Sequence, residues 1–164
     1  ARSGELHAIY QYMNQHYNLD DQDYPKLASK MRAIAIDEMR HAEDFAERIK
    51  DLGGDVTTDP DGKVQKKQDV HTIYPFDAAT EDDTIDAYNQ FHAVCRENGD
   101  TVSMKLFEAI IDEEQAHHTY FDNVATHIKT LGDTYLSKIA GTSASTGATV
   151  KGFVQNQSAA AVVA

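Results

Sequence analysis

Two short stretches of the sequence place a glutamate and a histidine three residues apart. They are Glu38 with His41, in "IDEMRHAE", and Glu114 with His117, in "IIDEEQAHH". Residues three apart on an α-helix project from the same side, with about 4.5 Å of rise between them. Because carboxylates and imidazoles are both common metal ligands, each pair could bind a metal ion.

Both pairs lie on apolar helical stripes, which places them on faces expected to be buried. Ile34 and Phe45 flank the first pair at helical spacing, and Ile110 and Phe121 flank the second. A buried carboxylate without a partner is costly, so it is normally paired or bound to metal. The stripes carry no basic residue, which favours a metal site over a buried salt-bridge network without metal.

The two pairs belong to an internal repeat. Glu5 precedes Glu38 by 33 residues, and Glu81 precedes Glu114 by the same number. A tyrosine follows seven residues after the first glutamate of each half, and these are Tyr12 and Tyr88. Folding the halves face to face would gather four carboxylates and two imidazoles, the ligand set of a di-iron carboxylate centre in a helical bundle.

The ligand types and spacing predict a role for each of these residues. Hard carboxylate oxygens favour iron and manganese, and imidazole suits iron. We expect the bridging carboxylates to be Glu38 and Glu114, with Glu5 and His41 completing one iron and Glu81 and His117 the other. Tyr12 and Tyr88 are expected to hydrogen-bond these ligands, the alternative being plain aromatic core.

The elements that must hold this set are helices, since no strand alternation is evident. The predicted helices are 5–17, 25–52, one from Thr80 as N-cap to "ENGD", and 101–131, with a short amphipathic piece at 134–140. Gly53 is expected to end the second, and 54–79 is predicted to be a connector without helical period. Two helical hairpins joined by a long crossover describe an all-α, ferritin-like four-helix bundle with a short C-terminal fifth helix.

Composition narrows the class of protein. The chain has 164 residues, a net charge of −12 and a sequence pI near 4.9, which argues against nucleic-acid binding. No apolar run is long enough to span a membrane, and the single cysteine, Cys95, excludes an intrachain disulfide framework, so a cytoplasmic protein is expected. We predict one domain at 1–140 and a low-complexity tail at 141–164.

Three segments, "GELHAIYQYM", "AIDEMRHAEDFAERI" and "IIDEEQAHHTYFD", resemble bacterioferritin, the haem-containing branch of the ferritins, within a similarity spanning residues 1 to about 140. The resemblance implies iron storage and detoxification in a hollow homo-oligomeric shell of 24 subunits built from two-fold dimers. There a di-iron ferroxidase centre oxidises Fe(II) with O2 or H2O2, and ferric mineral collects in the cavity. It also implies a haem or related iron porphyrin, one per subunit dimer, and a protein that donates electrons for iron release.

Met39 is the residue for which the spacing and the resemblance differ. It follows Glu38 and is rotated about 100° from the inner face, so spacing alone favours an ordinary apolar residue on the flank. The resemblance implies that Met39 is the axial ligand of the haem iron. Some relatives carry a histidine that binds a further iron on the cavity wall, where this chain has Ala33.

Other functions are also compatible with these residues. One is a rubrerythrin-type di-iron peroxidase, against which Met39 and the lack of a cysteine-rich domain argue. Another is a haem-binding shell whose di-metal site is static. The least favoured is a DNA-protecting mini-ferritin, because its site has a different spacing and its tail is usually basic, whereas this tail has one lysine, Lys151.

Overall fold

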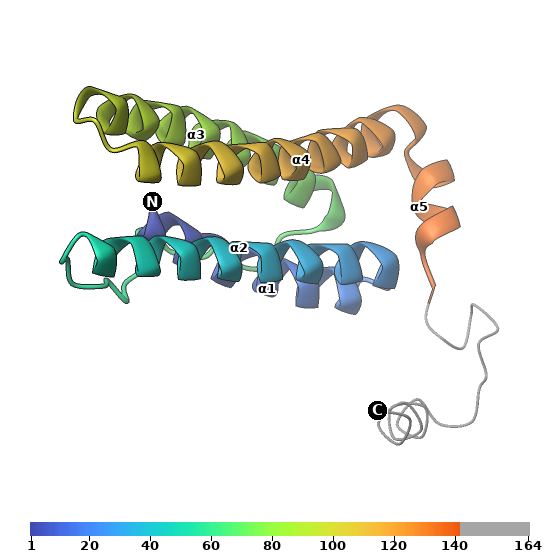
Figure 1. Cartoon of the computed structure of the whole chain (residues 1–164). Coiled ribbons are helices and arrows are strands. Elements are labelled where there is room, and N and C mark those ends of the chain that lie inside the picture. The colour runs from blue at the N-terminus through green and yellow to red at the C-terminus, as the bar shows by residue number, and fades with distance from the viewer. Residues whose placement is uncertain (142–164) are drawn as a thin grey trace, which may run out of the picture.

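Four long helices and one short helix make up the computed structural model, which describes residues 1–141. The helices are α1 (Arg2–Asp21), α2 (Pro25–Asp51), α3 (Val70–Glu97), α4 (Thr101–Leu131) and α5 (Asp133–Ile139). Helices α1 and α2 form one antiparallel hairpin, α3 and α4 form a second that lies against it, and α5 lies at one end (Figure 1). The all-α, ferritin-like four-helix bundle with a short fifth helix is therefore confirmed. The predicted tail lies outside the described residues apart from Gly141.

The first hairpin has the ends that its sequence predicts. Pro25 occupies the first turn of α2, where its missing N–H and fixed φ are tolerated. After α2, Gly53 adopts a φ of +76° and its N–H donates to the carbonyl of Lys50. Only glycine takes this left-handed conformation without strain, so Gly53 stops the helix as expected.

The N-cap of helix α3 lies eleven residues before Thr80, so the prediction of Thr80 as the N-cap was wrong. The cap is Asp69, whose side chain accepts from the backbone N–H groups of His71 and Thr72, both at 3.0 Å. The Thr72 hydroxyl in turn accepts from the Asp69 N–H, which completes a capping box. Pro75 interrupts the pattern in sequence, but the cap and the buried side chains of the first turns outweigh its missing N–H.

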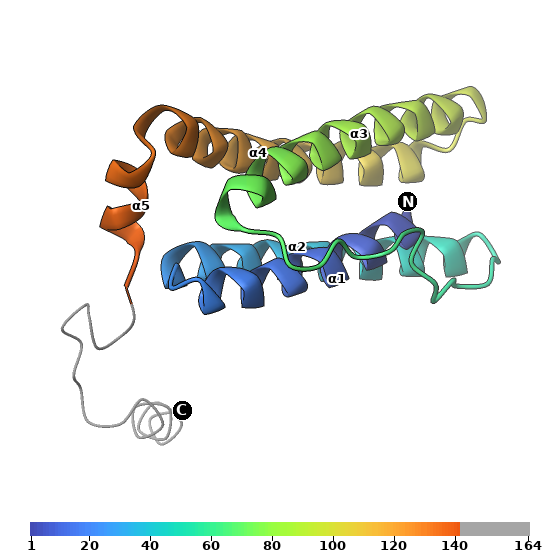
Figure 2. The same ribbon diagram turned by 180° about the vertical axis from the view of Figure 1, so that it is seen from behind.

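The crossover between the hairpins lies along α1 (Figure 2). The Gln11 side chain pairs with the backbone of Gln65 through both of its amide atoms, at 2.8 and 3.1 Å. Further along, Gln22 accepts from the N–H of Val70 at the start of α3. At the far end, the Gly141 N–H donates to the Asp23 carbonyl, which fixes α5 against the turn between α1 and α2.

The interior consists of two apolar clusters with a polar layer between them. On α2, Ile34 belongs to the larger cluster and Phe45 to the smaller one. On α4 the order is reversed, with Ile110 in the smaller cluster and Phe121 in the larger. The polar layer therefore lies where the two Glu-x-x-His segments cross the bundle. None of the helices among residues 1–141 is long and apolar enough to cross a bilayer.

The revised start of α3 can be tested with two alanine substitutions. Asp69→Ala removes the cap and is expected to lower the free energy of unfolding by about 1 kcal/mol. Thr80→Ala lies inside the helix, where alanine is the better helix former, and is expected to change stability by about 0.5 kcal/mol or less. Denaturant unfolding of the metal-free variants measures both; a larger loss for Thr80→Ala would contradict the structure.

Candidate di-metal centre

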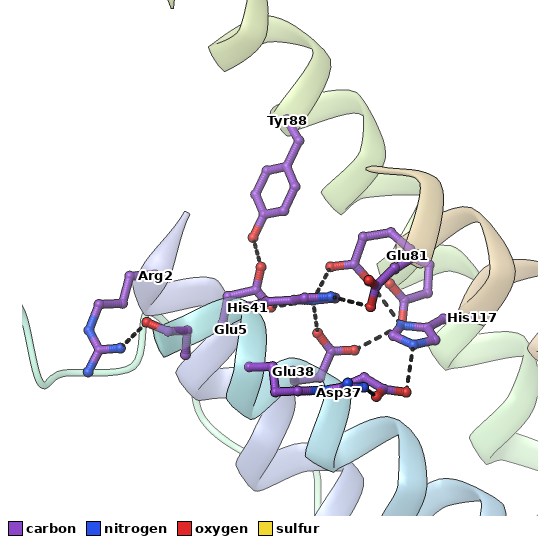
Figure 3. Close-up of polar contacts among 12 residues, drawn as sticks. Arg2, Glu5, Asp37, Glu38, His41, Glu81, Tyr88 and His117 are labelled. Atoms are coloured by element: carbon purple, nitrogen blue, oxygen red, sulfur yellow. Dashed lines mark hydrogen bonds and ion pairs between the residues drawn. The ribbon is translucent and has the colours of Figure 1, made fainter. Parts of the chain in front are cut away.

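Six buried side chains from the four long helices form the polar layer (Figure 3). Helices α1 and α3 each contribute one glutamate, and α2 and α4 each contribute one glutamate and one histidine. They are Glu5, Glu38, His41, Glu81, Glu114 and His117, and each is at most 6% exposed. The structure thus brings together all six residues that the sequence singled out.

The two glutamates of the Glu-x-x-His segments occupy the middle of the layer. Glu38 places one oxygen 3.1 Å from Nδ1 of His41 and the other 3.1 Å from Nδ1 of His117. Glu114 likewise places one oxygen 3.1 Å from Nδ1 of His117 and the other 3.2 Å from Nδ1 of His41. Each carboxylate therefore spans both histidines, the position that a bridge between two metal ions requires.

Glu5 and Glu81 lie on either side of this middle. An oxygen of Glu5 lies 3.7 Å from Nδ1 of His41. Within residues 1–141, two groups of possible ligand atoms lie within 4.8 Å of one another: Glu5, Glu38, His41 and Glu114; and Glu38, Glu81, Glu114 and His117. The groups share Glu38 and Glu114, so the layer has room for two ions with two carboxylates in common.

Tyr12 and Tyr88 connect the two halves of the chain. The Tyr12 hydroxyl, on α1, donates to Glu81 on α3 at 2.5 Å. The Tyr88 hydroxyl, on α3, donates to Glu5 on α1. Both tyrosines are buried, and each orients the outer glutamate of the opposite half.

Sequence reasoning gave no role to two acidic residues that contact the histidines from the other side. Nε2 of His41 lies 3.1 Å from Glu113, and Nε2 of His117 lies 3.6 Å from Asp37. These contacts leave both Nδ1 atoms facing the middle of the layer. Asp37 and Glu113 are 76 residues apart, the offset that relates the two halves, so extending the repeat by one position would have found them.

Burial and neighbouring charges shift the pKa values of the glutamates in this layer. Burial, together with the charges of Glu38 and Glu114, raises the pKa of Glu5 to about 8. Burial also raises the pKa of Glu81. Against the effect of burial, hydrogen bonds with His117 and His41 lower the pKa of Glu38 to about 2.

The pKa values of both histidines are raised. Against burial, contacts with Glu114 and Glu38 raise the pKa of His117 to about 9, and the same carboxylates raise the pKa of His41. In the metal-free protein near neutral pH, protons on both histidines and on Glu5 therefore offset carboxylate charge. Divalent cations would take over that role and release these protons.

The unpaired oxygens test whether the layer fits metal ions. One oxygen of Glu38 and one of Glu114 are buried and make no hydrogen bond of good geometry, although each lies near a histidine Nδ1, at 3.1 and 3.2 Å. An unpaired buried acceptor is normally costly, and a cation between the carboxylates would satisfy both. Four carboxylates also match the charge of two divalent ions, so the donor set fits a pair of them.

Met39 lies outside this layer. It is 55% exposed and faces a hollow on the surface of α1 and α2, which Leu6, Ile9 and Tyr10 also line. The flank position that the helical spacing predicts is therefore the one observed. Tyr10 and Ile36 are exposed large apolar residues of the same two helices.

The contacts behind the histidines lead to a first prediction for the site. Glu113→Gln is expected to weaken Co²⁺ binding about 10- to 100-fold, because outer-shell partners of ligating histidines have effects of that size. Asp37→Asn should have the smaller effect, since its distance to the ring is 3.6 Å against 3.1 Å for Glu113. Anaerobic Co²⁺ titration measures both, with Glu108→Gln on the exposed face of α4 as the control. Equal affinities in Glu113→Gln and the control would contradict the role of Glu113.

Comparisons with known proteins agree with this geometry. A family model for the ferritin-like domain matches residues 2–131. The bacterioferritin of Desulfovibrio desulfuricans is 65% identical over 154 residues, which cover 94% of this chain and 86% of that protein. Bacterioferritin BfrA of Mycobacterium tuberculosis is 32% identical over 131 residues, 80% of this chain and 82% of that protein.

Solved structures show the same relationship. The X-ray structure of the Desulfovibrio desulfuricans bacterioferritin, described in terms of its diiron site in different catalytic states, matches with a TM-score of 0.85 and 64% identity, over 93% of this chain and 89% of that one. The structure of Mycobacterium tuberculosis BfrA matches with a TM-score of 0.81 and 30% identity, over 85% of this chain and 89% of that one. The resemblance drawn from the sequence is confirmed, and the chain belongs to the bacterioferritin family.

Proposed function

We propose that this protein is an iron-storage ferroxidase, which oxidises Fe(II) in pairs with O2 or H2O2 and stores the product as ferric mineral. The observation that carries the proposal is the pair of buried ligand groups that share Glu38 and Glu114. The diiron site described for the Desulfovibrio desulfuricans bacterioferritin, at 64% identity, supports iron as the metal.

The distances support a role for each ligand. Glu38 and Glu114 would bridge the two iron positions, because each spans both histidines. Glu5 and His41 would complete one position, and Glu81 and His117 would complete the other. In this assignment each imidazole binds through Nδ1, since Nδ1 faces the carboxylates and Nε2 faces Glu113 or Asp37.

The reaction needs two electrons, which the two Fe(II) ions supply together. They reduce O2 with two protons to H2O2, or H2O2 with two protons to two water molecules. The protein contributes a fixed, buried set of ligands whose four negative charges favour the higher charge of Fe(III). Tyr12 and Tyr88 hold the outer glutamates in place, and apolar clusters cover the layer on either side along the bundle.

The finer architecture is also part of the proposal. We propose that Met39 would bind the iron of a haem or related iron porphyrin, which would be shared between two copies of the chain across a two-fold dimer interface. An exposed thioether in an apolar hollow fits such a soft ligand. Such dimers would build the 24-subunit shell, and the haem would pass electrons from a donor protein to the mineral when iron is released.

Stopped-flow oxidation of Fe(II) tests the ferroxidase. With O2 or H2O2 we expect a fast phase that saturates at about two Fe(II) per subunit, as two ion positions require. Glu114→Ala should abolish that phase because it removes a bridging ligand, whereas Glu108→Ala on the exposed face of α4 should retain it. If assembled protein shows no fast phase with either oxidant, the ferroxidase proposal fails and a haem-binding shell with a static di-metal site is favoured. Fast turnover with H2O2 but no mineral would instead indicate a rubrerythrin-like peroxidase.

Haem content tests the role of Met39. Met39→Leu conserves side-chain volume but lacks sulfur, so we expect loss of the bound porphyrin absorbance without loss of fold. The fast phase of Fe(II) oxidation should persist, because Met39 lies outside the ligand layer. Met104→Leu on α4 is the matched control. Equal porphyrin content in the two variants would show that Met39 is not the ligand.

A further inference from the structure

A cavity leads from the surface of the bundle to the di-metal centre. It lies mainly between α1 and α3 and has a volume of about 290 Å³. Its exposed lining includes Asp61 and Asp83, and its buried lining includes Glu5 and Glu81. The outer ligands of the centre can therefore be reached from the face of the bundle along which the crossover lies (Figure 2).

His7 and Asp61 lie close together in this lining. Nδ1 of His7 is 3.6 Å from a carboxylate oxygen of Asp61, which is longer than a hydrogen bond. Two ligand atoms that each lie about 2.1 Å from one ion can be separated by such a distance. Nε2 of His7 is buried and has no hydrogen-bond partner, so no protein group fixes the ring through that atom.

The crossover holds this pair in place. The Asp61 N–H donates to the carbonyl of Ser3 at 3.1 Å, and Arg2 donates to the carbonyl of Thr57 at 2.8 Å. The His7 ring packs against the backbone of Gly62, where an added Cβ would lie only 2.6 Å from the ring. The hydrogen-bonded crossover and the close approach of Gly62 therefore hold the two side chains in position.

We propose that His7 and Asp61 form a transient capture site for hydrated Fe(II), from which the ion moves through the cavity to Glu5 and Glu81. The inference rests on the proposed ferroxidase function and assigns the path of its substrate. Two ligands suit a transit site because they hold an ion weakly. Among residues 1–141, the groups of three or more ligands occur only at the centre itself. The Asp83 carboxylate adds negative charge along the same path.

The rate of Co²⁺ binding without oxygen tests the proposal independently of Fe(II) oxidation. The double variant His7→Gln/Asp61→Asn removes both ligands. The matched control, His71→Gln/Asp86→Asn, makes the same chemical changes at exposed positions outside the cavity. Stopped-flow absorbance gives the association rate at low and high salt, and titration gives the number of ions bound at equilibrium.

We expect the His7/Asp61 variant to bind Co²⁺ about tenfold more slowly than the control at low salt, because local charge raises the on-rate of a cation. The difference should shrink at high salt, and both variants should still bind two ions per subunit. Gly62→Ala keeps both side chains but displaces the His7 ring, and it should also slow binding.

Equal association rates in the two double variants would overturn the proposal. Loss of Co²⁺ capacity in the His7/Asp61 variant would overturn it as well, because the pair would then support the centre rather than the path. A different result would show that the ferroxidase proposal fails: wild-type protein would bind two Co²⁺ ions but would not oxidise Fe(II) rapidly.

Discussion

The burial of four carboxylates in the middle of a helical bundle is the constraint that shapes the whole molecule. Carboxylates with so little exposure are unfavourable unless opposite charge compensates them. In the metal-free protein, protonation of the two histidines and of Glu5 offsets part of the carboxylate charge. Two divalent cations would supply all of it and would also bind the oxygens of Glu38 and Glu114 that make no well-formed hydrogen bond.

The repeat of 76 residues explains how the chain meets this constraint. Every group in the centre has a counterpart in the other half, and the main contacts run between halves: Tyr12 with Glu81, Tyr88 with Glu5, and His41 with Glu113. The centre therefore joins the two hairpins. Ions bound there would stabilise the assembled bundle in proportion to their affinity, because the unfolded chain cannot offer the same set of ligands.

Much of this site could be predicted from the sequence, because the spacing of residues along a helix determines which face of the helix they share. Glu38 with His41 and Glu114 with His117 are three apart, and Glu5 and Glu81 repeat at one interval, so the spacing alone indicates their faces and partners. The start of α3 could not be predicted, because Pro75 hides the helical pattern and the cap at Asp69 lies in the connector. Asp61 was missed for a related reason: it lies in a loop without period, and only tethering to Ser3 places it beside His7. The role of Met39 rests on family resemblance, since its spacing indicates only an exposed flank.

The proposed bridging of two iron ions by Glu38 and Glu114 inside each bundle can be tested by anomalous diffraction at the iron edge, from crystals soaked anaerobically in Fe(II). We expect two peaks about 3.5–4 Å apart, as in other two-metal sites. Both peaks should lie within bonding distance of Glu38 and Glu114, and each should lie beside one histidine Nδ1. A single peak, or two peaks that share neither glutamate, would show that these carboxylates do not bridge a pair of ions.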